Sequence, residues 1–187
     1  MPELKLYMVL LGATPPGRTI EQHDIFFGIA ASIKELVPDI IKYWPEAAGR
    51  IHVDAFREVT FVDGYKVSVQ QKRQVVNDGE EVKLFFLNLG GYKPGEFEEY
   101  HYKMIVAAAD KATAIKQAKK TAFYKHTGYK GAASHIDDKY GIDVDDIHQI
   151  SDILSAELKR NYSIMLSPTD ARDEDELHIG YFKLDKM

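Results

Sequence analysis

Two stretches of the chain show the same order of hydrophobic and polar positions. Lys5–Ala31, KLYMVLLGATPPGRTIEQHDIFFGIAA, aligns without a gap with Lys83–Ala109, KLFFLNLGGYKPGEFEEYHYKMIVAAA. In each stretch, two apolar runs of strand length flank a polar loop that contains a Pro-Gly turn signal. Each stretch therefore predicts a pair of β-strands. The apolar runs are nearly continuous, which predicts that both faces of the sheet are covered there.

The two stretches are also similar in residue identity. Ten of the 27 aligned positions are identical, whereas unrelated sequences of ordinary composition would match at about one or two. The identical pairs are Lys5/Lys83, Leu6/Leu84, Leu11/Leu89, Gly12/Gly90, Pro16/Pro94, Gly17/Gly95, Glu21/Glu99, His23/His101, Ala30/Ala108 and Ala31/Ala109. The sequence thus predicts an internal duplication.

An amphipathic helix is predicted after each strand pair. Ser32 and Glu35 have the spacing of a capping box, and apolar residues then recur at helical spacing as far as Trp44. Pro38 lies inside this helix and is expected to kink or delay it. In the second copy, Asp110 is the expected N-cap of a proline-free run of strong helix formers.

Two further strands are predicted to complete each copy. In the first copy, the dipeptide Asp63-Gly64 is the signal for a type I′ hairpin. It lies between two predicted strands, RIHVDAFREVTFV and YKVSV. The second has SHIDDKYGIDVDDIHQI, then a polar stretch of helical character, then the strand YSIML at 162–166. LHIGYFKL, near the C-terminus, is predicted to be an edge strand.

Together these elements predict an α+β fold of two tandem strand-strand-helix-strand-strand units with mainly antiparallel sheets. We assign residues 1–70 to the first repeat unit, 71–82 to a linker, 83–166 to the second repeat unit, and 167–187 to an acidic loop and the C-terminal edge strand. One helix covers only one face of each unit. The other face is expected to be buried by the other unit, which gives a pseudo-twofold pair.

Composition narrows the classes of function. The chain has 187 residues, of which 45% are hydrophobic and 28% charged, as in folded globular proteins. It has no cysteine, which excludes disulfides and thiolate zinc sites. A formal net charge of −5 argues against general electrostatic binding to nucleic acid or anionic lipid. The N-terminal apolar run is too short for a membrane span and lacks signal-peptide features, so we expect a soluble cytoplasmic protein.

Histidine and aspartate recur at matching places in the two copies. The pairs are His23 with His101, His52 with His135, and Asp54 with Asp137. In each copy the second histidine precedes its aspartate by two residues, and residues two apart on a strand share a face. A strand order that brings these ends together assembles a His-His-Asp cluster in each copy.

Two interpretations of these clusters remain open. In the first, each is a ligand set or an acid–base pair, because two imidazoles and a carboxylate can bind a divalent metal or transfer protons. In the second, each is a hydrogen-bond network that closes a hairpin onto the neighbouring strand. The sequence makes no cofactor evident, so a divalent metal is retained only as an alternative.

Other polar motifs predict turns or surface. The acidic residues between Asp137 and Asp146 fit no EF-hand register. The loops Gly12–Gly17 and Gly90–Gly95 lack the glycine spacing of nucleotide-binding loops and are typical of turns. A basic set near the second helix is compatible with a solvated surface or with an anion-binding face. This set is Lys116, Lys119, Lys120, Lys125, His126 and Lys130.

These motifs resemble domain-of-unknown-function family 1543. The resemblance rests on Leu-Gly, the Pro-Gly loop, Glu-x-His, HVD and DGY in one copy and HIDDKYGIDVDD in the other, and it covers about Lys5–Leu166. The second copy lacks the tryptophan and the Asp-Gly-Tyr. The resemblance implies a small bacterial protein with two copies of the domain, and it implies no activity, substrate or catalytic residue.

We therefore expect a non-enzymatic binding or scaffold module with structural His–Asp networks. The alternative is a metal-assisted or general acid–base enzyme of hydrolase type that uses a His-His-Asp cluster in one or both repeats. The expected partner is a small ligand or a protein, and self-association through sheet or helix faces is a further option. A membrane is not expected, and the acidic balance disfavours nucleic acid.

Overall fold

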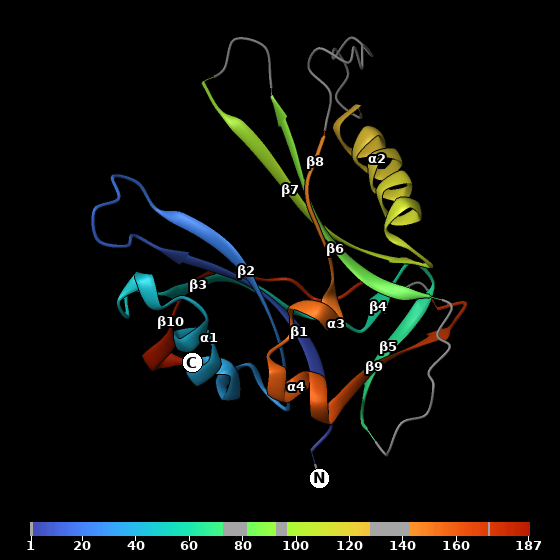
Figure 1. Cartoon of the computed structure of the whole chain (residues 1–187), viewed down its shortest axis with the longest axis horizontal. Coiled ribbons are helices and arrows are strands. Elements are labelled where there is room, and N and C mark those ends of the chain that lie inside the picture. Colours follow the sequence, from blue (N-terminus) through green and yellow to red (C-terminus); the bar gives the residue numbers. More distant parts are fainter. Residues whose placement is uncertain (1, 73–81, 93–96, 128–142, 172) are drawn as a thin grey trace. The chain divides into compact units, whose positions relative to one another are not determined.

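The chain forms two compact units in a computed structural model. The structure describes residues 2–72, 82–92, 97–127, 143–171 and 173–187. Unit 1 consists of Met1–Asp78 and Leu154–Met187, and unit 2 of Gly79–Ile153. The described strands form three antiparallel sheets accompanied by a few helices, which confirms the predicted α+β class (Figure 1). The C-terminal segment therefore returns to the unit in which the chain begins.

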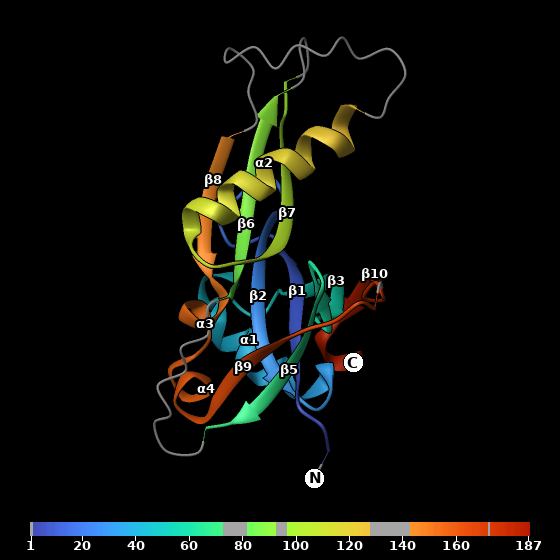
Figure 2. The same ribbon diagram turned by 90° about the vertical axis from the view of Figure 1, so that its right-hand side faces the viewer.

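Unit 1 contains a four-stranded sheet in the order β10-β3-β1-β2. β1 (Lys5–Ala13) pairs with β2 (Gln22–Ala30) on one side and with β3 (His52–Glu58) on the other. β10 (His178–Lys183) adds to the far side of β3, and Figure 2 shows the two strands next to each other. The C-terminal segment is thus an edge strand, as predicted.

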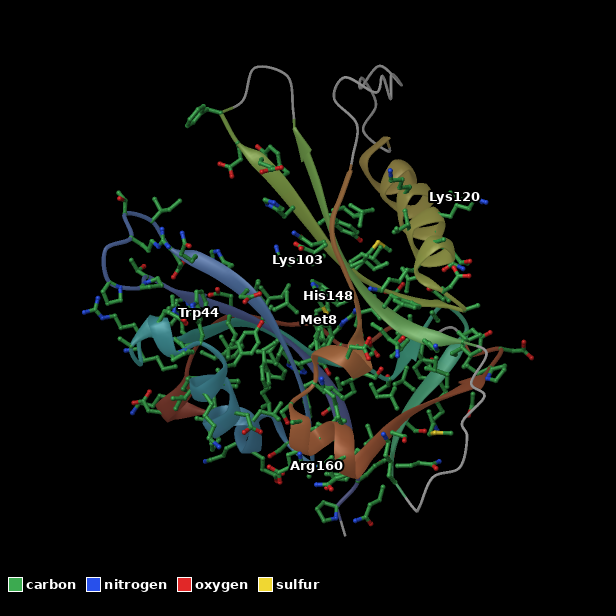
Figure 3. The ribbon with its side chains drawn as sticks, in the orientation of Figure 1. Met8, Trp44, Lys103, Lys120, His148 and Arg160 are labelled. Atoms are coloured by element: carbon green, nitrogen blue, oxygen red, sulfur yellow. The ribbon has the colours of Figure 1, made fainter. Side chains whose placement is uncertain are left out.

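A short helical segment packs on one face of this sheet. η1 (Ile33–Leu36) leads into α1 (Val37–Tyr43), and η2 (Pro45–Ala47) follows. Pro38 stands in the first turn of α1, where it needs no intrahelical partner, so it delays the α-helix without breaking it. Trp44 packs against this core from the end of α1 (Figure 3). The core includes Tyr7, Val9, Leu11, Phe26, Leu36, Ile40 and Val53.

The opposite face of the sheet is also buried along β1 and β2. The buried residues on it are Leu6, Ile25, Phe27 and Ile29. Both faces are therefore covered at these two strands, as the near-continuous apolar runs predicted. The pseudo-twofold packing of the two units stays a prediction.

The two helix starts differ. At the first, Glu35 accepts hydrogen bonds from the Ala31 amide at 3.2 Å and the Ser32 hydroxyl at 3.4 Å. Ser32 caps no backbone amide, and Glu35 accepts from the amide one residue before the N-cap, so neither backbone bond of the predicted capping box forms. At the second, Asp110 accepts from the Thr113 amide at 2.7 Å, as predicted, and this bond lowers the pKa of the Asp110 carboxyl.

The Asp63-Gly64 turn joins β4 (Phe61–Val62) to β5 (Tyr65–Gln71). Its residues have φ values of 49° and 83°, the positive pair that a type I′ turn requires. The strand predicted over 50–62 is interrupted, because the chain leaves the first sheet after β3 and enters a second sheet at β4.

The second sheet joins segments that are far apart in the sequence. Its order is β4-β5-β9, and β9 (Tyr162–Pro168) extends the strand predicted at 162–166 by two residues. The polar stretch before it forms α3 (Ile150–Ile153) and α4 (Ala156–Asn161), in agreement with its helical character. η3 (Leu184–Lys186) follows β10.

Unit 2 repeats the strand order of the first sheet. β6 (Lys83–Tyr92) lies between β7 (Glu99–Ala108) and β8 (Asp143–Gln149), and α2 (Lys111–Thr127) packs across one face (Figure 2). The register of β6 with β7 matches that of β1 with β2, residue for residue, across the aligned copies. This match supports the inferred duplication.

Some sequence expectations fall outside the described residues. Most of the predicted linker, 73–81, is among them, as are Lys130 and the side chains of Lys125 and His126. Lys116, Lys119 and Lys120 are exposed on α2, and Figure 3 shows Lys120 pointing away from the sheet of unit 2. In the described part of the chain, no helix is both long and apolar enough to cross a membrane.

Tyr7 is expected to make the folded state sensitive to alkaline pH. Its hydroxyl donates to Glu58 Oε1 at 3.1 Å, and burial, followed by the Glu58 charge, raises the pKa of Tyr7 to about 12. An unfolded tyrosine ionises at about pH 10, so this stabilisation is complete below that pH and is lost as the pH rises toward about 12. We expect the free energy of urea unfolding to fall across this range, and to fall less in Tyr7→Phe. An equal loss in both proteins would contradict the assignment.

Candidate functional site

Four ionisable side chains of unit 1 meet where β1 ends and β2 and β3 begin. We call Glu21, His23, His52 and Asp54 the His–carboxylate ring. The Nε2 atom of His52 lies 3.1 Å from Glu21 Oε1 and 3.1 Å from Asp54 Oδ1. The Nε2 atom of His23 lies 3.3 Å from Asp54 Oδ2 and 3.5 Å from Glu21 Oε2. Each imidazole thus faces both carboxylates. The structure brings together His23, His52 and Asp54, the three residues that the sequence singled out in this copy.

Gly12 is the β1 residue that lies between the two histidines of the ring. It pairs with His23 on β2 and with His52 on β3, so the three residues lie side by side across the sheet. A Cβ atom at position 12 would lie 2.5 Å from His52 Nε2 and 2.5 Å from Asp54 Oδ2. The ring can close only because this position has no side chain.

A β-bulge in β3 places Asp54 at the ring. The β1–β3 register shifts between Leu10 and Leu11, which pair with Ala55 and Val53, so Asp54 has no partner residue on β1. Bulges of this kind redirect one side chain and are frequent beside functional sites. His52 and Asp54 thus lie on one face, as predicted, although the strand that carries them is irregular.

One side of the ring is buried, and the other side, which we call the rim, is open to solvent. The His52 side chain is 7% exposed, and the Tyr181 ring of β10 lies against it with 4.2 Å between ring centroids. The side chains of Glu21 and His23, in contrast, are 44% and 42% exposed. A ligand can therefore reach the Glu21–His23 side from solvent.

Hydrogen-bond acceptors outnumber donors in the ring. Its two carboxylates offer four oxygens, whereas each Nε2 atom carries at most one hydrogen. Asp54 Oδ2 is buried, and although His23 Nε2 lies 3.3 Å away, this oxygen accepts no hydrogen bond from the described residues. When both carboxylates are ionised and both imidazoles neutral, the ring carries two uncompensated negative charges. These properties suit it to a donor-rich cation. Within the described residues, no group of three or more His, Asp or Glu side chains is arranged to hold a metal ion.

In unit 2, the strand register gives His52 a counterpart other than His135. His135 and Asp137 lie outside the described residues. The residue that pairs with Gly90, as His52 pairs with Gly12 in unit 1, is Asp143 at the start of β8. The unit 2 counterpart of His52 in strand pairing is therefore Asp143.

A sequence signal for this register exists. Ile-His-Val-Asp at 51–54 corresponds to Ile-Asp-Val-Asp at 142–145. The bulge recurs as well, because the β6–β8 register shifts between Asn88 and Leu89 and leaves Asp145 without a partner residue. The His-Ile-Asp triplet at 135–137 keeps the histidine of the first copy, whereas the strand that starts at Asp143 is the one that pairs with β6.

Sequence reasoning missed the glutamates. Glu21 contacts both histidines of the ring, and Glu99 lies 3.9 Å from His101 Nε2 in unit 2. Both belong to the identical pairs of the aligned copies and stand two residues before a histidine. That repeated Glu-x-His spacing was the available signal.

Two comparisons relate this chain to known proteins. The family model for Domain of Unknown Function (DUF1543) matches residues 18–69, a range that contains all four ring residues. The crystal structure of protein Il1583 from Idiomarina loihiensis is similar at 26% sequence identity and a TM-score of 0.65, over 97% of this chain and 99% of that one. No curated protein matches. The chain is thus similar to DUF1543 over residues 18–69, and its fold resembles that of Il1583 over nearly its full length.

Proposed function

We propose that the protein is a binding module whose His–carboxylate ring takes up a primary ammonium group. The excess of acceptors carries this proposal: four carboxylate oxygens surround two Nε2 atoms, and Asp54 Oδ2 is buried without a hydrogen bond from the described residues. A primary ammonium supplies three donors and a positive charge in one group. Glu21 and His23 form the exposed rim by which it enters.

The two halves of the ring have different roles in this proposal. His52 is nearly buried and contacts side chains from three segments, namely Glu21, Asp54 and Tyr181. It is therefore a structural tie between β3, β10 and the loop before β2. The exposed half, Glu21 and His23, faces the ligand.

Lys183 is a neighbouring positive charge that lowers the affinity. It lies opposite His52 in the β10–β3 register and is exposed. An exposed lysine is mobile and screened by salt, so it weakens the field of the ring without filling it. Lys183→Ala is expected to tighten cation binding by about twofold.

Titration with n-butylammonium tests the proposal. At about pH 8, where histidine is ordinarily neutral, the Cε1–H resonances of His23 and His52 should shift in a saturable way. Butyrate and n-butanol, which match the probe in size but lack its charge, should leave both resonances in place. Glu21→Gln should weaken binding about tenfold, because it removes a charged acceptor from the rim.

Glu46→Gln is the matched control, since Glu46 is an exposed glutamate of η2. It should bind n-butylammonium as the unaltered chain does. Equal binding of butyrate, or equal affinities in the two glutamine variants, would overturn the proposal. A response of the ring histidines to Zn²⁺ alone would overturn it too, because the ligand would then be a metal ion.

General acid–base catalysis is the second candidate, and one observation favours it. His23 is 42% exposed and has two carboxylates within 3.5 Å, the surroundings of an imidazole that exchanges protons with a bound molecule. Release of p-nitrophenol from carboxylic and phosphoric esters would test for it. Turnover by the unaltered chain that is lost in His23→Ala and kept in Glu46→Gln would support an enzyme; equal background rates in all three would exclude these reactions.

A further inference from the structure

The C-terminal strand carries two large apolar side chains that are exposed next to the ring. Ile179 is 76% exposed and Tyr181 65% exposed. We call these two residues the β10 shelf. Exposed apolar groups that adjoin a polar site are typical of ligand-binding surfaces.

The shelf lies on the same sheet face as the ring. His178 stacks on Phe56 and Phe182 contacts Phe56, so these two β10 residues face the core that packs on α1. Side chains of a strand alternate between faces, which puts Ile179 and Tyr181 on the opposite face. The contact between the Tyr181 and His52 rings confirms this placement.

We infer that the ligand of the ring is an ammonium ion with an apolar substituent, and that the substituent lies on the β10 shelf. This inference rests on the proposed function. The shelf alone would accept many apolar groups, but the carboxylates beside it select a positive head. The face of the Tyr181 ring is also attractive to a cation. In the strand order β10-β3-β1-β2 the shelf adjoins the ring at His52, so an alkyl chain that runs from the carboxylates across His52 reaches Tyr181 and then Ile179.

A comparison of methylammonium with n-hexylammonium tests the inference. The unaltered chain should bind n-hexylammonium at least about tenfold more tightly, because the longer chain removes apolar surface from water. Ile179→Ser should reduce this preference and leave methylammonium binding nearly unchanged. Tyr181→Ala should reduce the preference too, and it should also weaken methylammonium binding, because Tyr181 packs against His52 of the ring. Tyr181→Phe should retain the preference. Ile41→Ser alters an exposed apolar residue of α1, away from the shelf, and should also retain it.

The outcomes separate this inference from the proposed function. Equal affinity for the two amines, with both weakened by Glu21→Gln, would overturn the apolar substituent and leave the ammonium site standing. Failure of both amines to bind would overturn the two together. If light scattering shows a dimer that Tyr181→Ala converts to a monomer, the shelf is an interface between copies of the chain and the inference is wrong.

Discussion

Replacing Asp175 with alanine is expected to lower the free energy of unfolding by about 3 kcal/mol. The Asp175 side chain is only 1% exposed, and its Oδ2 atom lies 3.6 Å from Arg57 Nη1. Its Oδ1 atom accepts from the Thr60 amide at 2.8 Å, the Thr60 hydroxyl at 2.7 Å and the Phe61 amide at 3.2 Å. These donors lie where the chain passes from the first sheet to the second. Removing the carboxylate leaves them, and the Arg57 guanidinium, without this acceptor.

Urea unfolding followed by the fluorescence of Trp44 measures the effect, because Trp44 is the single tryptophan and belongs to unit 1. Asp175→Asn keeps an accepting oxygen and loses the negative charge near Arg57, so it should fall between the unaltered chain and Asp175→Ala. Asp173 is exposed in the same acidic segment, and Asp173→Ala should change the stability by less than about 0.5 kcal/mol. If Asp175→Ala unfolds at the same urea concentration as Asp173→Ala, the bonds of Asp175 do not stabilise the fold.

Local patterns in the sequence predicted the elements of this fold well. Apolar runs of strand length located β1 and β2, and the Asp63-Gly64 signal located the type I′ turn. The reason is that each of these features depends on residues close together in the chain. The delayed α1 helix follows in the same way from Pro38.

Pairings between distant segments could not be predicted in the same way. β5 pairs with β9, and β10 pairs with β3, because apolar surfaces far apart in the chain fit together. No local pattern encodes such a choice. The role of Asp175 is hidden for the same reason, since nothing in the acidic run around it distinguishes the one carboxylate that is buried.

The candidate site was predicted in part. Repetition between the copies led to His23 and His52, and strand alternation led to Asp54. Glu21 was missed although its spacing from His23 also repeats, because its contact with His52 joins residues far apart in the chain. The contact of Tyr181 with His52 could not be predicted, since it depends on the pairing of β10 with β3.

Gly12→Ala is expected to open the ring and abolish most of its cation binding. The added methyl would lie 2.5 Å from both His52 Nε2 and Asp54 Oδ2, so these two groups must move apart. We expect a loss of about 1–3 kcal/mol of stability from overpacking. We also expect at least tenfold weaker binding of n-butylammonium, roughly the effect of removing a charged hydrogen-bonding group. The measurements are urea unfolding and the titration of the histidine Cε1–H resonances.

Gly28→Ala separates the site effect from the stability effect. A methyl at position 28 would lie 2.7 Å from Leu36 Cδ2 and 2.8 Å from Phe26 Cε1, so it overpacks the other face of the same sheet by a similar amount. Gly28→Ala should therefore lose stability as Gly12→Ala does and still bind n-butylammonium with nearly unaltered affinity. Binding lost equally in both variants would mean that the ring depends on the general integrity of the sheet. Binding kept in Gly12→Ala would mean that the ammonium does not need the closed ring, because position 12 pairs with both His23 and His52.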